Sequence, residues 1–417
     1  MKRRNHWVLF AILLLALINL SPSETSTLMR SEDRGETEPI TPQRLETEKD
    51  PGSISVAVQL NESDFLRLQQ LNQQAADEYH IEVKLNNLPA GKDYSAIRQE
   101  LELGDSPDVL LLNNTWIRRF ASGGYLLPTE SYYSGSLTGE VLSASLTQNE
   151  WNGYVWAVPM DADPYVWVYH PGKLQEAGME FPATGSDWEA LLNAYKKQPS
   201  SPYLIALNFN DPYAVMSLMW QLTGQRGSTD ETSMFKPTKE LEAVVHHLDS
   251  VRPFLISLGA PGEEETWNKL FSGEAPFALV KWSEAKRHEH PNLKIVYPDQ
   301  ELQAGGAWVG GRSYAVSARS GNKEAAGLWI SAMTTQLQQR QWFDFTGYLP
   351  VLKTMYYQAS RNGLPTWIPA SFVNGKGTPL PVGAGIPLLM ERYGALSSSF
   401  LYGELSSKSY LIELESL

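Results

Sequence analysis

Cysteine is absent from the 417 residues of the sequence. The chain therefore forms no disulfide bridge, carries no thiolate nucleophile and has no zinc or iron–sulfur site held by cysteine. The lipid-modified cysteine that tethers many bacterial surface proteins is excluded for the same reason. The sequence therefore excludes functions that depend on thiol chemistry.

Positive charge is in short supply. The sequence has 34 Lys and Arg residues against 47 Asp and Glu residues, a formal net charge of −13 at pH 7. Nucleic-acid phosphates and anionic membrane faces need a basic surface, so the composition argues against both as partners of the folded body. A neutral or cationic ligand is easier to accommodate, although a local basic pocket would still bind an anion.

Signatures of catalysis and phosphate binding are also missing. No GxSxG or HExxH spacing occurs, and Gly305, Gly306, Gly310 and Gly311 fit neither a GxGxxG fingerprint nor a P-loop. Glycine there more simply permits hinge dihedrals and close approach of the backbone to a ligand. The run 288–290 (His-Glu-His) has no evident third metal ligand. The sequence therefore predicts no catalytic residue, no metal and no cofactor.

Aromatic residues, in contrast, are abundant: 13 Trp, 19 Tyr and 13 Phe. Aromatic faces pack well on the apolar faces of sugar rings, so this enrichment favours a carbohydrate ligand. A core rich in large side chains explains the same composition equally well. The positions of the rings along the chain have to decide between the two.

The N-terminal region has the pattern of an export signal. Basic residues at positions 2–4 precede an apolar run, 7–20, which would span about 21 Å as a helix, short of the roughly 30 Å hydrocarbon core. We therefore interpret residues 1–20 as a signal peptide, with a retained anchor near the membrane as the alternative. Residues 21–52 are rich in Ser, Thr, Glu and Pro and predict a disordered acidic tether. Both interpretations place the body outside the cytoplasm, secreted or at the cell surface.

The folded body begins with alternating strand and helix patterns, and its length allows two or three domains. The expected elements are the strand 54–60, the helix 61–79, the strand 81–85, the helix 93–103 and the apolar strand 109–112. A β-α-β-α-β order with a fully apolar third strand indicates a doubly wound α/β lobe.

A second pattern lies between Trp151 and Gly178. A turn at Asn152 and Gly153 leads into an apolar run that breaks at Pro159, and two carboxylates follow before a second strand at 165–169. Two strands joined by a short polar connection suit a chain that crosses from one lobe to another. Such a crossing places carboxylates and aromatic rings at the mouth of a cleft.

The order of these features resembles the crossing segment of the extracellular solute-binding proteins of ABC importers, in their sugar-binding branch (family 1). The matching positions in this segment are Asn152-Gly153, Val158-Pro159, Tyr169, Lys173-Leu174, Ala177-Gly178, Pro182 and Asp187-Trp188-Glu189. His170 departs from the asparagine usual in the family. Similar stretches are 94–128 in the first lobe, 266–282 in the second, and two further crossings at 305–311 and 347–350. The resemblance extends from about Ser53 to about Ser360.

The resemblance implies an α/β, two-lobed periplasmic-binding-protein-like fold of type II, with three inter-lobe crossings and a ligand cleft between the lobes. Lobe 1 is expected to comprise 53–160 and 311–348, and lobe 2 161–310 and 349–417. The implied function is capture of a carbohydrate outside the cytoplasm for the permease subunits of an ABC importer, without catalysis. A ligand-binding sensory ectodomain and a polysaccharide-active hydrolase or lyase are the alternatives.

Residues that follow strands or lie at crossings are the candidates for ligand contact. Amides and carboxylates would bind hydroxyls and rings would stack, whereas a capped turn or a core position is the structural alternative for each. The candidates are Asn113, Asn114, Thr115, Trp116, Asp161, Asp163, Trp220, Trp282, Gly306 and Trp308. Residues two apart on an extended segment share one face, so the two aspartates are poorly placed to bracket a glycosidic bond. Binding is therefore preferred to hydrolysis.

Overall fold

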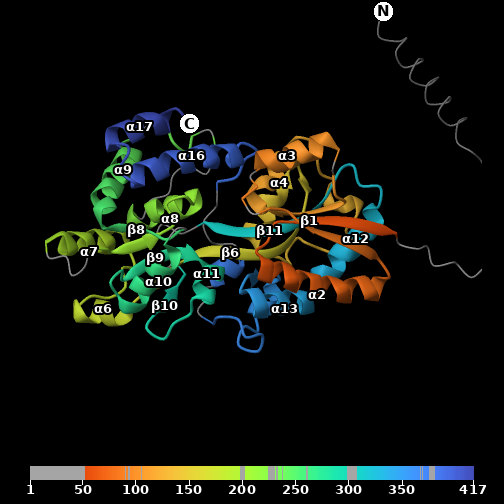
Figure 1. Ribbon diagram of the computed structural model, residues 1–417, viewed down its shortest axis with the longest axis horizontal. Coiled ribbons are helices and arrows are strands. Elements are labelled where there is room, and N and C mark those ends of the chain that lie inside the picture. The colour runs from red at the N-terminus through yellow and green to blue at the C-terminus, as the bar shows by residue number, and fades with distance from the viewer. Residues whose placement is uncertain are drawn as a thin grey trace, which may run out of the picture. The chain divides into compact units, whose positions relative to one another are not determined.

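One long strand, β6 (Val158–Tyr169), organises the computed structural model of the chain (Figure 1). The structure describes residues 52–89, 91–92, 94–104, 106–197, 202–223, 231, 233–236, 238–259, 262–297, 308–366, 368, 370–374 and 381–417. The expected signal peptide, the tether up to residue 51 and Gly306 lie outside the described residues. Among the described residues, no helix combines the length and the hydropathy that a membrane crossing requires.

Ten of the described strands form one sheet, in the order β2-β1-β3-β11-β6-β9-β7-β8, with β10 and β12 also paired to β6. Their bounds are β1 Ser53–Val58, β2 Glu82–Asn87, β3 Val109–Asn113, β7 Ile205–Leu207, β8 Leu255–Ser257, β9 Phe277–Lys281, β10 Lys294–Val296, β11 Val309–Val316 and β12 Leu349–Pro350. A separate hairpin joins β4 (Glu150–Trp151) to β5 (Tyr154–Val155). Asn152 and Gly153 make its turn with φ of 50° and 80°, which confirms the turn expected there.

The sheet is shared by two lobes because the two halves of β6 pair with different partners. The first half, 158–164, pairs with β11, which in turn pairs with β3 of the parallel group β2-β1-β3. The second half, 165–169, pairs with β9 of the parallel group β9-β7-β8. Each lobe is therefore a mixed α/β layer, and the expected two-lobed fold is confirmed.

Proline did not break β6 as the sequence led us to expect. Pro159 and Pro164 lie within one continuous strand, opposite Ser313 and Val309 of β11. Proline lacks an N–H group, and a register shift in β11 between Arg312 and Ser313 relaxes the pairing beside Pro159. The crossing is thus a strand rather than a polar connection.

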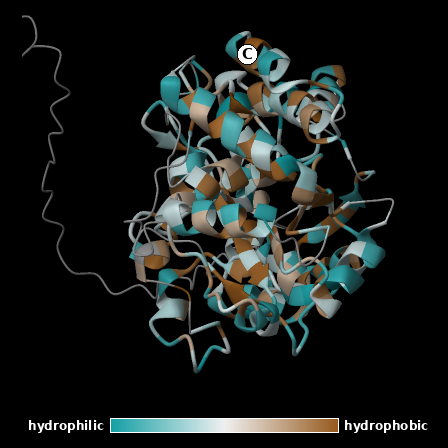
Figure 2. Ribbon diagram, turned by 90° about the vertical axis from the view of Figure 1, so that its left-hand side faces the viewer, coloured by the Kyte–Doolittle hydropathy of each residue, from teal (hydrophilic) through white to brown (hydrophobic). Residues whose placement is uncertain are grey.

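Helices flank the sheet in both lobes, as Figure 1 shows. Around β1 to β3 lie α2 Glu62–Tyr79, α3 Tyr94–Leu103, α4 Asn114–Ser122, α5 Ser143–Asn149, α12 Lys323–Met333 and α13 Gln336–Thr346. Around β7 to β9 lie α6 Pro171–Glu176, α7 Gly185–Lys197, α8 Pro212–Thr223, α9 Lys239–Val251, α10 Glu263–Ser272, α11 Trp282–Arg287, α16 Ile386–Leu401 and α17 Ser407–Glu415. Figure 2 shows hydrophilic and hydrophobic residues alternating around the helices of this second lobe, as expected where one helix face packs inward.

After β12 the chain remains against the first lobe. Leu142 N donates to Val351 O and Lys353 N donates to Glu140 O, and α14 (Lys353–Tyr356) and α15 (Ala370–Asn374) follow. The chain reaches the second lobe later, where α16 packs against both α8 and α4. The residue boundaries expected for the lobes stay a prediction.

Strand β3 shows how the core is built. Val109 and Leu111 face the main hydrophobic cluster, whereas Leu110 and Leu112 face a smaller cluster beneath α3 and α4. Side chains alternate across a strand, so a strand buried on both faces is apolar at every position. This burial confirms the buried parallel strand expected at 109–112.

Candidate functional site

A cavity of about 520 Å³ lies where the ends of the parallel strands meet β6 and β11. Asn113 ends β3, Asn208 follows β7, Gly259 follows β8 and Ser283 follows β9. The carboxyl ends of parallel strands are where α/β folds place their ligands. The full lining consists of Gln59, Asn113, Asn114, Thr115, Trp116, Gln148, Asp161, Asp163, Tyr165, Asn208, Tyr213, Leu258, Gly259, Glu263, Lys281, Ser283, Glu284, Arg287, Trp308, Gly310, Gly311, Arg312 and Tyr348.

The structure brings most of the expected site residues together at this cavity. Those in the lining are Asn113, Asn114, Thr115, Trp116, Asp161, Asp163 and Trp308. They come from the end of β3, the start of α4, the strand β6 and the residue before β11, so the strand-end reasoning located the cavity. It overlooked Gln59 and Lys281, although they follow β1 and end β9, and it did not locate Arg312 on β11 or Gln148 on α5.

The Asp161 carboxylate is fully buried and already bonded. It accepts from the backbone N of Arg312 at 3.0 Å, from the Arg312 guanidinium and from Trp342 Nε1 at 3.1 Å. The guanidinium also lies 4.0 Å from the centre of the Tyr348 ring. Asp161 therefore links β6 to β11 and α13 through hydrogen bonds. In the cavity wall it is one member of a buried ion pair.

Asp163 is likewise bonded within the protein. Its two carboxylate oxygens accept from Ser283 N at 2.8 Å and Ser283 Oγ at 2.7 Å, at the start of α11. Burial raises the pKa of this carboxyl, and the charge of Lys281 and the Ser283 bonds offset part of that rise. Asp163 thus fastens the middle of β6 to α11.

Lys281 belongs to a second ionic group in the wall. Its Nζ lies 3.3 Å from Asp211 Oδ2, which also accepts from the Tyr165 hydroxyl at 2.6 Å. The Asp211 carboxylate raises the pKa of Lys281, so the ammonium keeps its charge at neutral pH. The positive charge is therefore balanced before any ligand arrives.

Glu284 is another carboxyl of the cavity wall whose pKa is shifted. Burial raises its pKa to about 7, against the opposing attraction of Lys281. Glu263 and Arg287 line the same wall of the second lobe. The charge of this wall therefore changes within the physiological range of pH.

The aromatic lining divides into rings that are covered and rings that are partly open. Trp308 is only 1% exposed, since its ring lies between Tyr213, at 4.6 Å, and Trp220, at 6.1 Å and nearly parallel. Trp116, Tyr213 and Tyr348 are half-buried and keep part of their surface toward the cavity. These three rings are the better platforms for stacking.

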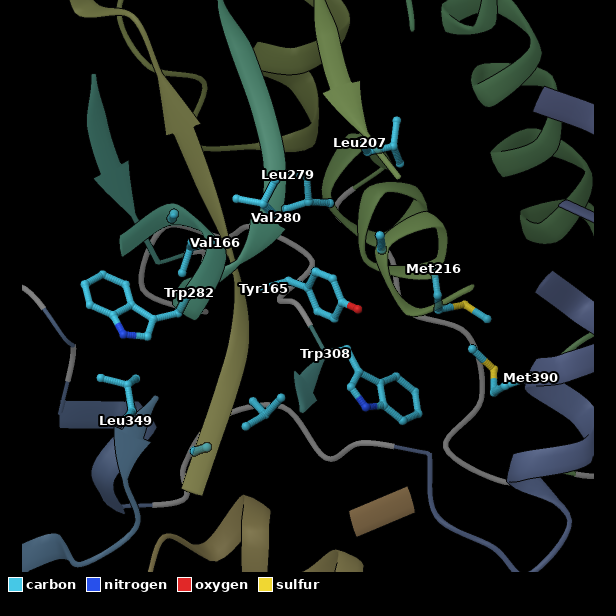
Figure 3. Close-up of a cluster of buried hydrophobic side chains, with 14 of the residues drawn as sticks. Tyr165, Val166, Leu207, Met216, Leu279, Val280, Trp282, Trp308, Leu349 and Met390 are labelled. Carbon is cyan, nitrogen blue, oxygen red and sulfur yellow. The ribbon is translucent and has the colours of Figure 1, made fainter. Parts of the chain in front are cut away.

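Trp220 and Trp282 do not line the cavity, although both were expected at the ligand. Trp282 is the first residue of α11, and its Nε1 donates to Gly347 O at 2.7 Å in the core. Figure 3 shows its ring beside Leu349, with Tyr165 and Trp308 on the other side of β6. Trp220 packs behind Trp308 on α8. A place after a strand, as at Trp282, or near a helix end, as at Trp220, does not fix which way a ring turns, and both rings pack inside the protein.

The glycines of β11 allow two strands and a side chain to approach closely. A Cβ at Gly311, where φ is +153°, would lie 2.4 Å from Asp161 O and 3.0 Å from Asn114 Nδ2. A Cβ at Gly310 would lie 2.9 Å from Asp163 O. The close approach expected for these glycines is thus observed, but it is to β6 and Asn114.

The His-Glu-His run serves ring stacking. His288 lies parallel to Trp267 at 4.1 Å, and His290 stacks on Phe271 at 4.5 Å. Within the described part of the chain, no group of three or more His, Asp or Glu residues is arranged to hold a metal ion. The rings of His288 and His290 thus pack against aromatic side chains of α10.

The chain resembles known proteins in sequence and in fold. The family model of the bacterial extracellular solute-binding proteins matches residues 68–363. A maltotriose-binding protein of Pyrococcus abyssi is 23% identical over 299 residues, which cover 68% of this chain and 64% of that protein. The alignment thus spans a little less than two thirds of that relative.

Two solved structures illustrate the likeness in fold. The GacH receptor of Streptomyces glaucescens, solved unliganded and with acarbose, has a TM-score of 0.69 and 19% identity, covering 88% of this chain and 97% of that chain. UgpB of Mycobacterium tuberculosis, in complex with glycerophosphocholine, has a TM-score of 0.70 and 18% identity over the same shares. At these identities the likeness establishes the fold, and it agrees with the two lobes described above.

Proposed function

The chain belongs to the bacterial extracellular solute-binding proteins, whose model matches residues 68–363, and from this premise we propose that it captures an uncharged carbohydrate in the cavity for an ABC importer. Proteins of this family are extracellular, so membership implies that the chain functions outside the cytoplasm. The carbohydrate, the permease and the residues of contact are the parts that we propose.

The observation that carries the proposal is that the charged side chains along β6 and at the end of β9 have partners inside the protein, whereas Glu263, Glu284 and Arg287 are ionisable side chains elsewhere in the lining. Asp161 is paired with Arg312, Lys281 is paired with Asp211, and Asp163 is held by Ser283. What the lining offers a ligand is then mostly amides, hydroxyls and partly open rings. A carbohydrate matches this surface, since it presents hydroxyls at its edges and C–H groups on its faces.

The same contacts argue against a hydrolase. Glycosidases need two carboxyl groups that are free to act as acid and as base or nucleophile on opposite sides of a bond. Asp161 and Asp163 lie on one strand, and their oxygens are taken up by Arg312, Trp342 and Ser283. Binding without transformation therefore fits the site better.

Ligand capture would act through the two lobes. Thr115 on α4 and Tyr213 on α8 both line the cavity, and the Tyr213 hydroxyl donates to Thr115 Oγ1 at 3.3 Å. A ligand held by both walls adds contacts that exist only when the lobes are close. It would thereby shift the population of lobe arrangements toward the closed form that a permease recognises.

The names of related proteins support a carbohydrate and suggest one competitor. The relative from Pyrococcus abyssi is a maltotriose-binding protein, and GacH was solved with acarbose. UgpB was solved with glycerophosphocholine, a ligand that carries charges. Glu263, Glu284 and Arg287 are the cavity residues that would favour such a ligand.

A thermal-shift screen tests the proposal. The panel contains maltose, maltotriose, acarbose, D-mannitol, D-tagatose and glycerophosphocholine, each analysed afterwards by chromatography for product. We expect at least one carbohydrate to stabilise the protein, by about 2.7 kcal/mol at 100 times its dissociation constant, and to be recovered unchanged. Stabilisation by glycerophosphocholine alone, or release of a hydrolysis product, contradicts the proposal.

A further inference from the structure

Two buried side-chain atoms in the cavity wall have no hydrogen-bond partner within the described part of the chain. They are Nδ2 of Asn114 and Oε1 of Gln148, whose residues are 1% and 3% exposed. Buried polar atoms in proteins are almost always bonded, because leaving one unpaired costs free energy. Among the described residues both atoms are thus left for another partner, and one is a donor whereas the other is an acceptor.

The orientation of the Gln148 amide is fixed by two carbonyl groups. Its Nε2 donates to Ala144 O at 2.9 Å and to Val309 O at 3.1 Å. Only the nitrogen of an amide donates, so a flipped amide would set oxygen against oxygen at both places. Oε1 is consequently the atom left without a partner.

The orientation of the Asn114 amide is fixed by a relay of three side chains. Asn149 Nδ2 donates to Ser145 O at 2.9 Å and to Ser313 Oγ at 2.8 Å. Ser313 therefore accepts from Asn149 and donates its own hydrogen to Asn114 Oδ1, at 2.6 Å. Nδ2 is then the free end of the Asn114 amide.

Gly311 lies beside that free end, where there is no room for a side chain. A Cβ at this position would lie 3.0 Å from Asn114 Nδ2, so any other residue would crowd the amide. Gln148 is bonded to Val309 of the same strand, two residues away. Both residues thus line the cavity beside the first residues of β11.

We propose that Asn114 and Gln148 form a hydroxyl-binding subsite, in which Asn114 Nδ2 donates to and Gln148 Oε1 accepts from hydroxyl groups of the bound carbohydrate. This inference rests on the proposed function and names the chemistry that the site selects. A hydroxyl group both donates and accepts, so it satisfies both atoms. A carboxylate or phosphate dianion has no hydrogen for Gln148, and an ammonium group has no lone pair for Asn114.

The subsite discriminates by leaving buried atoms unpaired when the wrong group is bound. A site built to hydrogen-bond a hydroxyl rejects an analogue that lacks it more strongly than an apolar pocket rejects an extra methylene group. Asn114 was among the residues expected from the sequence, but Gln148 was not, since it lies on α5 and follows no parallel strand.

Calorimetric titration of the full chain with maltotriose, maltose, acarbose and D-mannitol tests the subsite, using for the variants whichever probe the wild type binds most tightly. Gln148→Met keeps the volume and removes the acceptor, together with the two bonds from Nε2 to Ala144 O and Val309 O. Asn114→Asp keeps the oxygen that Ser313 bonds and replaces the donor by an acceptor. Gln338→Met is the matched control, since Gln338 is 7% exposed and has an unpartnered Oε1 but lies outside the cavity.

Gln148→Met and Asn114→Asp should each raise the dissociation constant about tenfold, because one hydrogen bond is lost and its buried partner is left unpaired. The dissociation constant of the control Gln338→Met should stay within about twofold of the wild-type value. Thermal unfolding without carbohydrate shows which variants fold. If Gln148→Met does not fold, the affinity of Asn114→Asp alone tests the subsite. Unchanged affinity in the folded variants overturns the subsite alone. Failure of the wild type to bind any of the four probes overturns the proposed function and the subsite with it.

Discussion

At the scale of single residues, the cavity wall is governed by charges that find partners inside the protein. Among the described residues, Asp161 and Arg312 form the most buried ion pair, with side-chain exposures of 0% and 13%. A buried pair contributes little net stability, but removing one member leaves the other charge uncompensated. The pair is therefore a sensitive point of the fold.

We predict that Asp161→Asn lowers the free energy of unfolding by about 3–5 kcal/mol, because the Arg312 guanidinium then stays buried without its counter-charge. Urea denaturation followed by circular dichroism measures the change. The exposed pair Arg340–Asp344 supplies the control, since Asp344→Asn should cost about 1 kcal/mol or less. Equal losses in the two variants would show that Asp161 is not buried as described.

The Glu284 carboxyl should make stability depend on pH. Burial raises its pKa to about 7 in the folded chain, above the value of about 4.5 that it has when solvated, so the folded state favours the protonated form. Its contribution is complete below about pH 4.5 and is lost as the pH rises through about 7. We expect Glu284→Gln to be more stable than the wild type at pH 8 and to lose this slope.

Thermal unfolding between pH 5 and pH 8 measures that difference. Glu264→Gln on the exposed first turn of α10 is the control, and its profile should run parallel to that of the wild type. A Glu284→Gln profile that also runs parallel would contradict the assignment.

The sequence located many of the ligand candidates but not their partners. Asn113, Asn114 and Trp116 follow a strand that is plainly apolar, so their place at the sheet edge could be read directly. Arg312 lies 151 positions from Asp161, and no local pattern connects them. Whether a carboxylate faces a ligand or a side chain of the protein depends on the tertiary structure. The sequence therefore did not show that Asp161 and Asp163 already have partners inside the protein.

At the scale of elements, the contact between β6 and β11 sets the geometry of the site. The strands are held together by backbone pairing and by the Asp161–Arg312 bonds. Glycine at positions 310 and 311 allows them to approach closely. The twelve-residue β6 was expected as two strands, because a proline ordinarily interrupts a sheet. A neighbouring strand with a register shift accommodates Pro159, and a single-sequence pattern does not contain that information.

Gly311→Ala should separate these strands. The new Cβ would lie 2.4 Å from Asp161 O, at a φ of +153° that alanine rarely adopts, so we expect a loss of about 2 kcal/mol or more in the free energy of unfolding. Gly321→Ala is the control, because nothing lies within 4 Å of its Cβ position. Denaturation midpoints compare the two, and a loss no larger than that of Gly321→Ala would contradict the close approach.

At the scale of the whole molecule, two lobes share one sheet and one cavity. The alternating strand and helix patterns predicted an α/β lobe, and α2 (Glu62–Tyr79) lies where the helix 61–79 was expected, whereas the two-lobed arrangement was implied by the family resemblance. The lobe boundaries stay a prediction. Residues 351–353 pair with residues 140–142 through backbone bonds, which depend on no side-chain pattern.

Ligand binding should make the molecule more compact. If a carbohydrate bridges the two walls, small-angle X-ray scattering will show a smaller radius of gyration at saturation than without ligand. Trp116→Ala, which removes a half-buried ring from the wall of the first lobe, should bind more weakly and need more carbohydrate to reach the same compact state. An identical radius with and without bound carbohydrate would contradict closure.

A crystal structure of the chain with the carbohydrate that stabilises it best would show where and in what form the ligand binds. We expect an intact carbohydrate inside the cavity of about 520 Å³, with hydroxyls bonded to Asn114 and Gln148 and a ring face against Trp116, Tyr213 or Tyr348. A carbohydrate bound elsewhere on the surface, or cleaved within the cavity, would contradict this expectation.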